Sequence, residues 1–265
     1  MSFAQNAVDG SRVYFEDDGG EGAPVVLQGG LVDSVASVRA SQVAQGLPRD
    51  EFRLVFVDHR GLGRSDKPHD AEAYATPLRV ADTMAVLDAL GLERVHFVGN
   101  SWGGRLGFGI GEHAPERVLS LVLGGQQPYA IDPEGPLVKA VTAALAASRE
   151  NGSVRPFVDA LETFSDVRFP DALRAQWLDN DAAALDAAWR AALAEGSISA
   201  DLRAWRLRCL VYAAVGDADF YEQARRAAEE IPDAQFVAVE AHDHVGAHLQ
   251  HDSVLPAVLR TLRGG

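Results

Sequence analysis

One short motif constrains this chain more than any other feature. It runs from Gly99 to Gly103 in the pattern G-x-S-x-G, with Ser101 at its centre. Residues 95–98 before it are apolar and β-prone, and residues 105–110 after it can begin a helix. A strand, a sharp turn with a serine at the apex and a helix are typical of a nucleophile elbow. Such a turn strains the backbone at the serine and leaves no room for a Cβ two residues away on either side, which explains both glycines.

Apolar runs of strand length alternate with helical patterns along most of the chain. The expected strands are residues 11–15, 24–28, 54–58, 95–98, 118–123, 209–215 and 236–239, and the expected helices are residues 35–47, 77–90, 182–194, 221–230 and 254–262. This alternation predicts an α/β fold with a doubly wound, mostly parallel sheet.

The alternation stops between residues 127 and 205, where the chain is rich in Ala, Asp and Arg and shows helical patterns alone. We therefore expect a core made of residues 1–126 and 206–265, with residues 127–205 inserted as a helical cap. Such a cap would cover the carboxyl edge of the sheet, where open α/β sheets bind ligands.

A serine nucleophile on this kind of elbow is followed in the sequence by an acid and then by a histidine. Asp217 and Asp219 both follow the expected strand 209–215, and His242 and His244 follow the expected strand 236–239. All of these residues lie just past the carboxyl end of a strand, so they can meet Ser101 at one edge of the sheet.

These motifs, together with the turn at residues 58–65, resemble the α/β-hydrolase superfamily over nearly the whole chain. The resemblance implies a Ser-His-Asp triad. The acid turn of the family is G-x-x-D, which favours Asp219 over Asp217; the alternative is that Asp219 caps a helix and Asp217 is the acid. The spacing between the histidine of the family and its last helix favours His244 over His242.

Gln28-Gly29-Gly30 lies where the superfamily usually has His-Gly-x. The resemblance implies that the backbone N–H groups of Gly30 and Trp102 form the oxyanion hole. Gln28 departs from the usual histidine, which supports this loop through hydrogen bonds. Trp102 and Leu31 are expected to line the substrate pocket.

The activity implied by the resemblance is hydrolysis of a carboxylic ester or lactone through an acyl-enzyme, with His244 taking the proton of Ser101. The elbow sequence at residues 99–104, with Asn100 before the serine, resembles the elbow of C–C bond hydrolases. The Ser101-Trp102 pair is similar to the corresponding pair in proline iminopeptidases. A serine at the apex argues against haloalkane dehalogenases and epoxide hydrolases, which use a carboxylate there. The alternative from another class is a ligand-binding receptor that hydrolyses its ligand slowly.

No cofactor and no metal are expected. His244, His248 and His251 are close enough in the sequence to raise the question of a metal site. A zincin needs a glutamate directly after the first histidine, and Val245 stands there instead.

Charge and composition indicate that the binding partner is a small-molecule substrate. The net charge of −14 argues against nucleic acid and against an anionic membrane surface. Residues 127–205 carry 12 acidic and 7 basic side chains. This excess indicates either a solvated surface or a pocket for neutral or cationic substrates, and the aromatic residues of the same segment favour bulky or apolar ones. The oligomeric state stays open.

The location expected for the chain is the cytoplasm. The first residues show no secretory signal, and no apolar run reaches the roughly 18 residues that a membrane span requires. Cys209 is the single cysteine, so no internal disulfide can form. This cysteine usage fits a reducing compartment.

Overall fold

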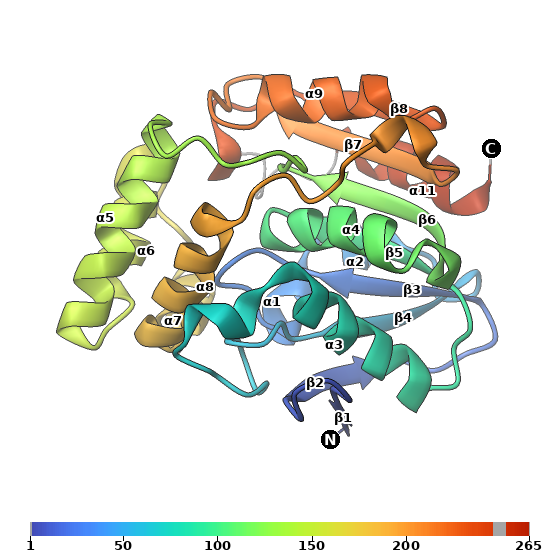
Figure 1. Cartoon of the computed structure of the whole chain (residues 1–265), viewed down its shortest axis with the longest axis horizontal. Coiled ribbons are helices and arrows are strands. Elements are labelled where there is room, and N and C mark those ends of the chain that lie inside the picture. Colours follow the sequence, from blue (N-terminus) through green and yellow to red (C-terminus); the bar gives the residue numbers. More distant parts are fainter. Residues whose placement is uncertain (1, 246–252, 265) are drawn as a thin grey trace.

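An eight-stranded sheet forms the centre of the computed structural model, which describes residues 2–245 and 253–264 (Figure 1). The strand order is β1-β2-β4-β3-β5-β6-β7-β8. The strands are β1 (Ser2–Gln5), β2 (Arg12–Asp17), β3 (Ala23–Gln28), β4 (Phe52–Val57), β5 (Val95–Asn100), β6 (Val118–Gly124), β7 (Arg208–Ala214) and β8 (Ala234–Val239). β1 and β2 pair in antiparallel fashion, as do β2 and β4, and every pair from β4 to β8 is parallel. The expected mostly parallel α/β sheet is confirmed.

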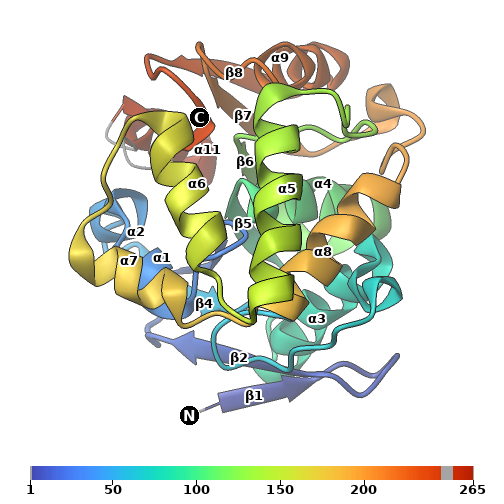
Figure 2. The same cartoon turned by 90° about the vertical axis from the view of Figure 1, so that its left-hand side faces the viewer.

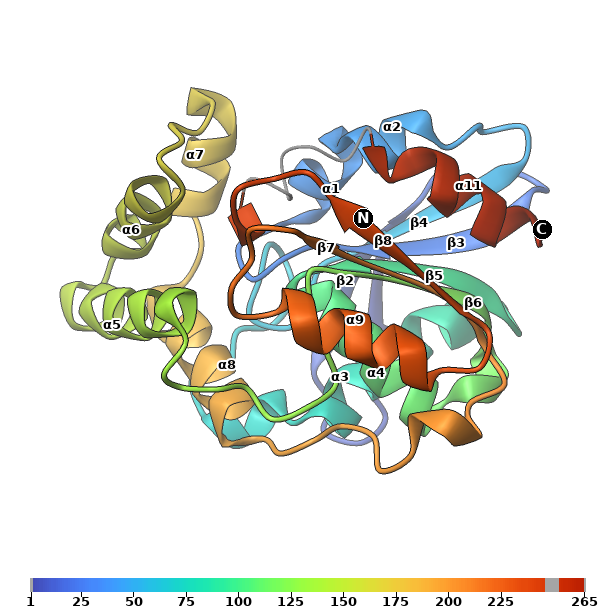
Figure 3. The ribbon, with the colours of Figure 1, turned by 90° about the horizontal axis from the view of Figure 1, so that it is seen from above.

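Helices cover both faces of the sheet (Figure 3). One face carries α3 (Thr76–Ala89), α4 (Trp102–His113) and α9 (Tyr221–Glu230), and the other carries α1 (Val35–Ala40), α2 (Gln42–Gly46) and α11 (Leu255–Arg263). Each face has its own buried apolar cluster. The middle strands are buried on both sides, which is why β4 and β6 are almost continuous apolar runs.

Four further helices follow β6 and precede β7, and we call this stretch the helical segment. They are α5 (Pro136–Asn151), α6 (Arg155–Ser165), α7 (Asp171–Leu178) and α8 (Ala182–Ala194). Figures 1 and 2 show them together beyond the carboxyl ends of the parallel strands. They share a third apolar cluster, which also includes Val32 and Trp102 from the loops at the sheet edge. The segment therefore packs directly on the loops that hold the candidate site. Short 3₁₀ turns stand at Ala71–Tyr74, Pro115–Arg117 and Leu202–Ala204.

Two elements differ from the sequence-based expectation. The strand β1 was not expected, because Ala4 is its one buried residue and it offers no apolar run. The helix expected over residues 35–47 is divided into α1 and α2 at Ser41, whose backbone is extended and whose Oγ accepts a hydrogen bond from the N–H of Ala44. A serine that caps a new helix ends the previous one. Within the described residues, no helix is both long and apolar enough to cross a membrane.

Candidate active site

Ser101 stands on the turn between β5 and α4 in a strained conformation, with φ 52° and ψ −112°. A Cβ at Gly99 would clash with the carbonyl of Gly103, and a Cβ at Gly103 would clash with the carbonyl of Gln28. Both glycines are therefore required by close backbone packing, as the motif predicted. The strain keeps the serine side chain out of the sheet and above its carboxyl edge.

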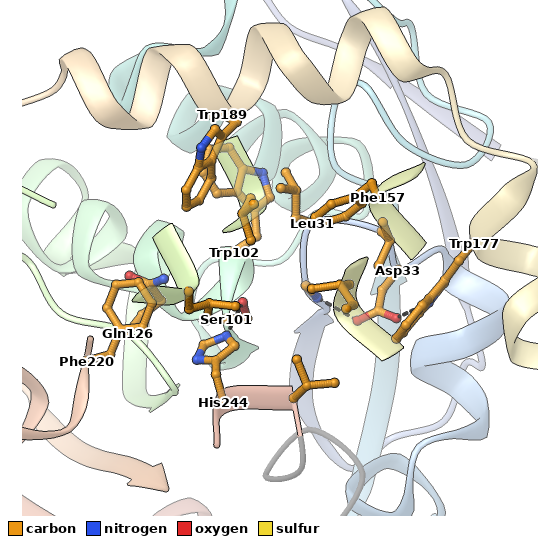
Figure 4. Close-up of a pocket in the computed structure, with 16 residues that line it drawn as sticks. Leu31, Asp33, Ser101, Trp102, Gln126, Phe157, Trp177, Trp189, Phe220 and His244 are labelled. Atoms are coloured by element: carbon orange, nitrogen blue, oxygen red, sulfur yellow. Dashed lines mark hydrogen bonds between the residues drawn. The ribbon is translucent and has the colours of Figure 1, made fainter. Parts of the chain in front are cut away.

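Three side chains form a continuous hydrogen-bonded chain at this edge. The Oγ of Ser101 lies 2.8 Å from Nε2 of His244, and Nδ1 of His244 lies 2.8 Å from Oδ2 of Asp217 (Figure 4 shows the serine and the histidine). A carboxylate only accepts, so Nδ1–H of the histidine donates to Asp217 and the neutral ring accepts the Ser101 hydroxyl at Nε2. This is the tautomer that a histidine needs in order to act as a base toward the serine.

The aspartate that contacts His244 is Asp217, so the expectation that Asp219 holds this place is wrong for the geometry observed. The Oδ1 of Asp217 accepts from the N–H groups of Asp219 and Phe220, which leaves Oδ2 facing His244. Asp219 points the other way, and its Oδ2 accepts from the N–H of Leu137 at 2.7 Å, in the first turn of α5. Burial raises the pKa of Asp219, and the nearby charge of Asp217 adds to this effect. The alternative from the sequence was that Asp219 caps a helix. This alternative agrees better with the structure, and the helix that Asp219 contacts is α5 of the helical segment.

His244, not His242, contacts Ser101. The histidines considered for a metal site, His248 and His251, lie outside the described residues. Residues 2–245 and 253–264 hold no cluster of three or more His, Cys, Asp or Glu side chains that could bind a metal ion.

The two expected oxyanion donors differ in their surroundings. Trp102 is the first residue of α4, where N–H groups have no acceptor within the helix. Gly30 borders the serine, since a Cβ built on it would lie 3.9 Å from Oγ of Ser101. Its N–H, however, donates to Oδ2 of Asp33 at 2.7 Å. The Oδ1 of Asp33 accepts from Nε1 of Trp177 on α7 at 3.1 Å, so this carboxylate joins the oxyanion loop to the helical segment (Figure 4).

His59 supports the loop after β3, residues 28–33, which holds the expected oxyanion donor Gly30. In this loop Gln28 stands where the α/β-hydrolase superfamily usually has a histidine. The Nε2 of His59 lies 3.0 Å from the carbonyl oxygen of Gly29, and its Nδ1 lies 3.2 Å from Nε2 of Gln28. The Gln28 amide oxygen accepts from the hydroxyl of Thr83. Burial lowers the pKa of His59 to about 3, with the charge of Arg79 as a further cause. The ring is therefore neutral, with Nε2 donating to Gly29 and Nδ1 accepting from Gln28.

A buried arginine lies behind Trp102. The guanidinium of Arg79 stacks 3.7 Å from the centre of the Trp102 ring and donates to the Trp102 carbonyl oxygen at 3.0 Å. Burial lowers the pKa of Arg79 to about 9, against the raising effect of Glu195. Arg79 thus holds both the backbone and the side chain of Trp102, the residue that follows Ser101.

The serine opens into a cavity of about 80 Å³ with a mostly apolar wall. Trp102 and Leu31 line it, as expected. The other lining side chains are Val32, Asp33, Gln126, Leu137, Val141, Phe157, Leu161, Trp177, Trp189, Phe220, His244 and Val245. None of the acidic residues of the helical segment is among these described lining residues; Asp159 and Glu162 pair with Arg174 instead.

Sequence reasoning missed Asp33, Gln126, His59 and Arg79 as parts of the site. His59 belongs to a turn that the analysis had singled out, so its position carried a signal. Asp33 and Gln126 follow expected strands by a few residues, which was a weaker signal. Arg79 lies inside a helix, and nothing in the sequence pattern connects it to Trp102.

Comparison with known proteins identifies the family and the fold. The profile of the family described as alpha/beta hydrolase fold matches residues 23–245. Proline iminopeptidase from Neisseria gonorrhoeae is 38% identical over 117 residues, which are 43% of this chain and 36% of that protein. The matches to the first curated relatives span 21 to 42% of the lengths of those proteins.

Two solved structures cover nearly the whole chain. A hydrolase from Pseudomonas aeruginosa PA01 aligns with a TM-score of 0.81 and 25% identity over 98% of this chain and 97% of its own. An esterase from Exiguobacterium antarcticum aligns with a TM-score of 0.81 and 22% identity over 99% of both chains, a likeness of fold.

Proposed function

Because the chain belongs to the alpha/beta hydrolase fold family, we propose that it is a serine hydrolase that cleaves a carboxylic ester or lactone through an acyl-enzyme. The observation that carries this proposal is the hydrogen-bonded chain from Asp217 through His244 to Ser101, with both distances at 2.8 Å. The serine of that chain faces an apolar cavity, where a substrate acyl group would be held away from water.

The reaction follows from the geometry in two halves. In the first, Oγ of Ser101 attacks the substrate carbonyl carbon while Nε2 of His244 takes the hydroxyl proton. The imidazolium that forms is stabilised by Asp217, and it then gives its proton to the leaving alcohol as the C–O bond breaks. In the second half, His244 takes a proton from water, which attacks the acyl-enzyme and releases the acid and the free serine.

The oxyanion of each tetrahedral intermediate would be held by the N–H groups of Trp102 and Gly30. A donor of this kind contributes about 3–4 kcal/mol to the transition state. In the structure the N–H of Gly30 donates to the carboxylate of Asp33. An oxyanion would therefore have to replace this carboxylate as the acceptor, or share the N–H with it. The N–H of Trp102 lies in the first turn of α4, where the helix itself offers it no acceptor, so it would be the first donor to the oxyanion.

The apolar wall of the cavity favours a substrate whose acyl group is neutral and apolar, and we expect this acyl group to occupy the cavity. Its volume of about 80 Å³ is below the roughly 300–1,000 Å³ of pockets that hold drug-sized ligands. A bulky substrate would therefore extend beyond this cavity or displace part of its wall. We propose that residues 127–205 act as a cap that sets this size limit, since α5 to α8 supply large apolar side chains to the wall: Leu137, Val141, Phe157, Leu161, Trp177 and Trp189.

A fluorophosphonate probe tests the nucleophile without knowledge of the substrate. We expect one label, on Ser101, and none on the Ser101→Ala variant. That variant should lose activity by about 10⁵–10⁶-fold on p-nitrophenyl esters of short acyl chains, with its melting temperature nearly unchanged. Labelling elsewhere, or full activity of the alanine variant, would refute the proposal.

The same assays separate the alternative functions. A receptor would release about one equivalent of p-nitrophenol for each protein molecule and then stop. A prolyl-β-naphthylamide cleaved faster than every ester would indicate an iminopeptidase, the activity of the relative from Neisseria gonorrhoeae.

A further inference from the structure

Arg105 is a buried cation on α4, the helix that begins directly after Ser101. The residue is 0% exposed, and its backbone N–H donates to the carbonyl oxygen of Ser101 at 3.0 Å. Burial lowers the pKa of its guanidinium, and the charge and hydrogen bond of Glu195 act against this effect. A buried cation is costly unless it is paired and hydrogen-bonded, so the partners of Arg105 indicate what this residue does.

Two stretches of chain join the sheet to the helical segment, and Figure 1 shows both. Residues 125–135, the outgoing connection, lead from β6 to α5, and residues 195–207, the returning connection, lead from α8 to β7. The two connections contact each other, since the N–H of Ile198 donates to the carbonyl oxygen of Pro128 at 2.7 Å. Any movement of the helical segment relative to the sheet must pass through these two stretches.

The guanidinium of Arg105 bonds to both connections. Its Nη1 donates to the carbonyl oxygens of Gln127 at 3.2 Å and Tyr129 at 3.1 Å, on the outgoing connection. Its Nη2 donates to Oε2 of Glu195 at 3.2 Å and approaches the carbonyl oxygen of Gly196 at 3.5 Å, on the returning connection. One side chain on the helix after Ser101 therefore holds both ends of the helical segment.

Glu195 ties the returning connection to the sheet domain by charge as well. Its Oε2 also accepts from the hydroxyl of Thr76 at 3.0 Å, at the start of α3. Burial lowers the pKa of Arg79, and the charge of Glu195 is the main effect that opposes it. One carboxylate thus compensates two buried arginines, Arg79 and Arg105. Moving the returning connection away would leave both cations without it, which is unfavourable.

We infer that Arg105 is a positioning residue that fixes the helical segment over the cavity beside Ser101, and thereby limits the size of the acyl group that the cavity accepts. This inference rests on the proposed function, because it takes the cavity as the acyl site. Arg105 is not among the described residues that line the cavity, so its effect would pass through the two connections. The planar fork of an arginine presents donors in two directions at once, which a lysine cannot do.

Arg105→Lys tests the inference, because it keeps the positive charge but cannot bond to both connections. We expect the ratio of kcat/KM for p-nitrophenyl hexanoate to kcat/KM for the acetate to rise by at least about fourfold, the effect of one more buried CH₂. The value for the acetate should stay within about threefold, since Ser101 and His244 come from the sheet edge.

Hydrogen exchange provides a readout that a general loss of stability would not give. In Arg105→Lys the backbone amides of α5 to α8 should lose protection, while those of β3, β5 and β6 keep theirs. Mass spectrometry of peptides from the two regions measures this difference.

Two further variants complete the test. Ile110→Ala is the control on the same helix; it removes buried apolar contacts on one face of the sheet, so it should lower the melting temperature and leave the ester ratio unchanged. Glu195→Gln changes a side chain that is 24% exposed and removes the charge that both arginines share. It should shift the ester ratio in the same direction as Arg105→Lys but less, and it decides the question if Arg105→Lys does not fold.

Three results would overturn the inference: the ester ratio stays unchanged in Arg105→Lys and Glu195→Gln, Ile110→Ala shifts it as much, or the sheet loses protection together with α5 to α8. Fluorophosphonate labelling distinguishes these results from a failure of the proposed function. A wild-type protein that is labelled at Ser101, with variants that keep its ester ratio, contradicts the role of Arg105 alone. A wild-type protein that is not labelled contradicts the serine mechanism.

Discussion

The sheet edge and the helical segment border the same cavity, but they contribute different kinds of groups to it. At the sheet edge, Ser101, Asp217 and His244 come from short turns that follow strands, and backbone contacts fix these turns. From α5 to α8 the cavity receives apolar side chains and the indole of Trp177. A turn at a strand end holds a polar group in a defined place, which chemistry requires. A packed helical wall sets volume and polarity, which can change without disturbing the reacting groups.

The largest expected effect comes from substituting the aspartate that contacts His244. It tests whether the reacting groups all come from the sheet edge. Asp217→Asn should lower kcat by about 10⁴-fold, since the histidine loses the acceptor that sets its tautomer. Asp219→Asn should change kcat by less than 10-fold, because this side chain contacts the first turn of α5 and not His244. Steady-state kinetics on one short-chain ester measure both. The reverse order of effects would return the catalytic role to Asp219.

The helical wall should control substrate size. Trp189→Phe enlarges the cavity, and we expect the ratio of kcat/KM for hexanoate to kcat/KM for acetate esters to rise by about 10-fold, at about 0.8 kcal/mol for each buried CH₂. Trp205→Phe is the control, since Trp205 is equally buried but packs near Phe108, away from the cavity. If both variants shift the ratio alike, the change reflects general loosening and the size limit does not lie in α8.

Asp33 is the point where the two regions meet, so it can sharpen the comparison. Asp33→Asn removes a negative charge beside the Gly30 N–H, and the oxyanion then competes with a weaker acceptor. We expect Ser101 to react with a fluorophosphonate about 10-fold faster. Ser37→Ala removes a donor to Asp33 but keeps the charge, and its rate should stay within about twofold. Slower labelling of Asp33→Asn would show that this carboxylate supports the oxyanion loop instead of competing for it.

The smallest effect concerns charge. The acidic residues of the helical segment do not line the cavity, and the carboxylate that does, Asp33, already accepts from Gly30 and Trp177. We therefore expect the overall charge of −14 to act mainly on a charged ester as it approaches. Cationic esters should exceed matched anionic ones by a few-fold in kcat/KM at low salt. The difference should fade above about 0.1 M, where the screening length is near 10 Å. A large preference that persists in salt would show that the carboxylate of Asp33 in the cavity wall acts on the bound ester.

The sequence predicted the fold and the strained turn at Ser101 because both follow from local rules. Strand-length apolar runs identified all the parallel strands, and the glycines around Ser101 indicated the elbow before any contact was known. His244 could be chosen over His242 by its distance from the last helix. These features depend on residues close together in the chain.

The acid and the cavity wall could not be predicted in the same way. Asp217 and Asp219 stand two residues apart in one turn, and the choice between them depends on α5, which lies about 80 positions earlier in the chain and takes Asp219 as its partner. The wall depends on which faces of four helices turn inward, and packing decides this collectively.

The hydrogen bond between Gln28 and His59 has a consequence for which substitutions the chain can accept at these two positions. The hydrogen bond on the Gly29 carbonyl comes from a loop after β4 and not from residue 28 itself. Restoring the histidine that the family usually has at position 28 would bring a second ring toward a carbonyl that His59 already serves. Positions 28 and 59 are therefore coupled, and we expect a substitution at either one alone to disturb the hydrogen bond on the Gly29 carbonyl.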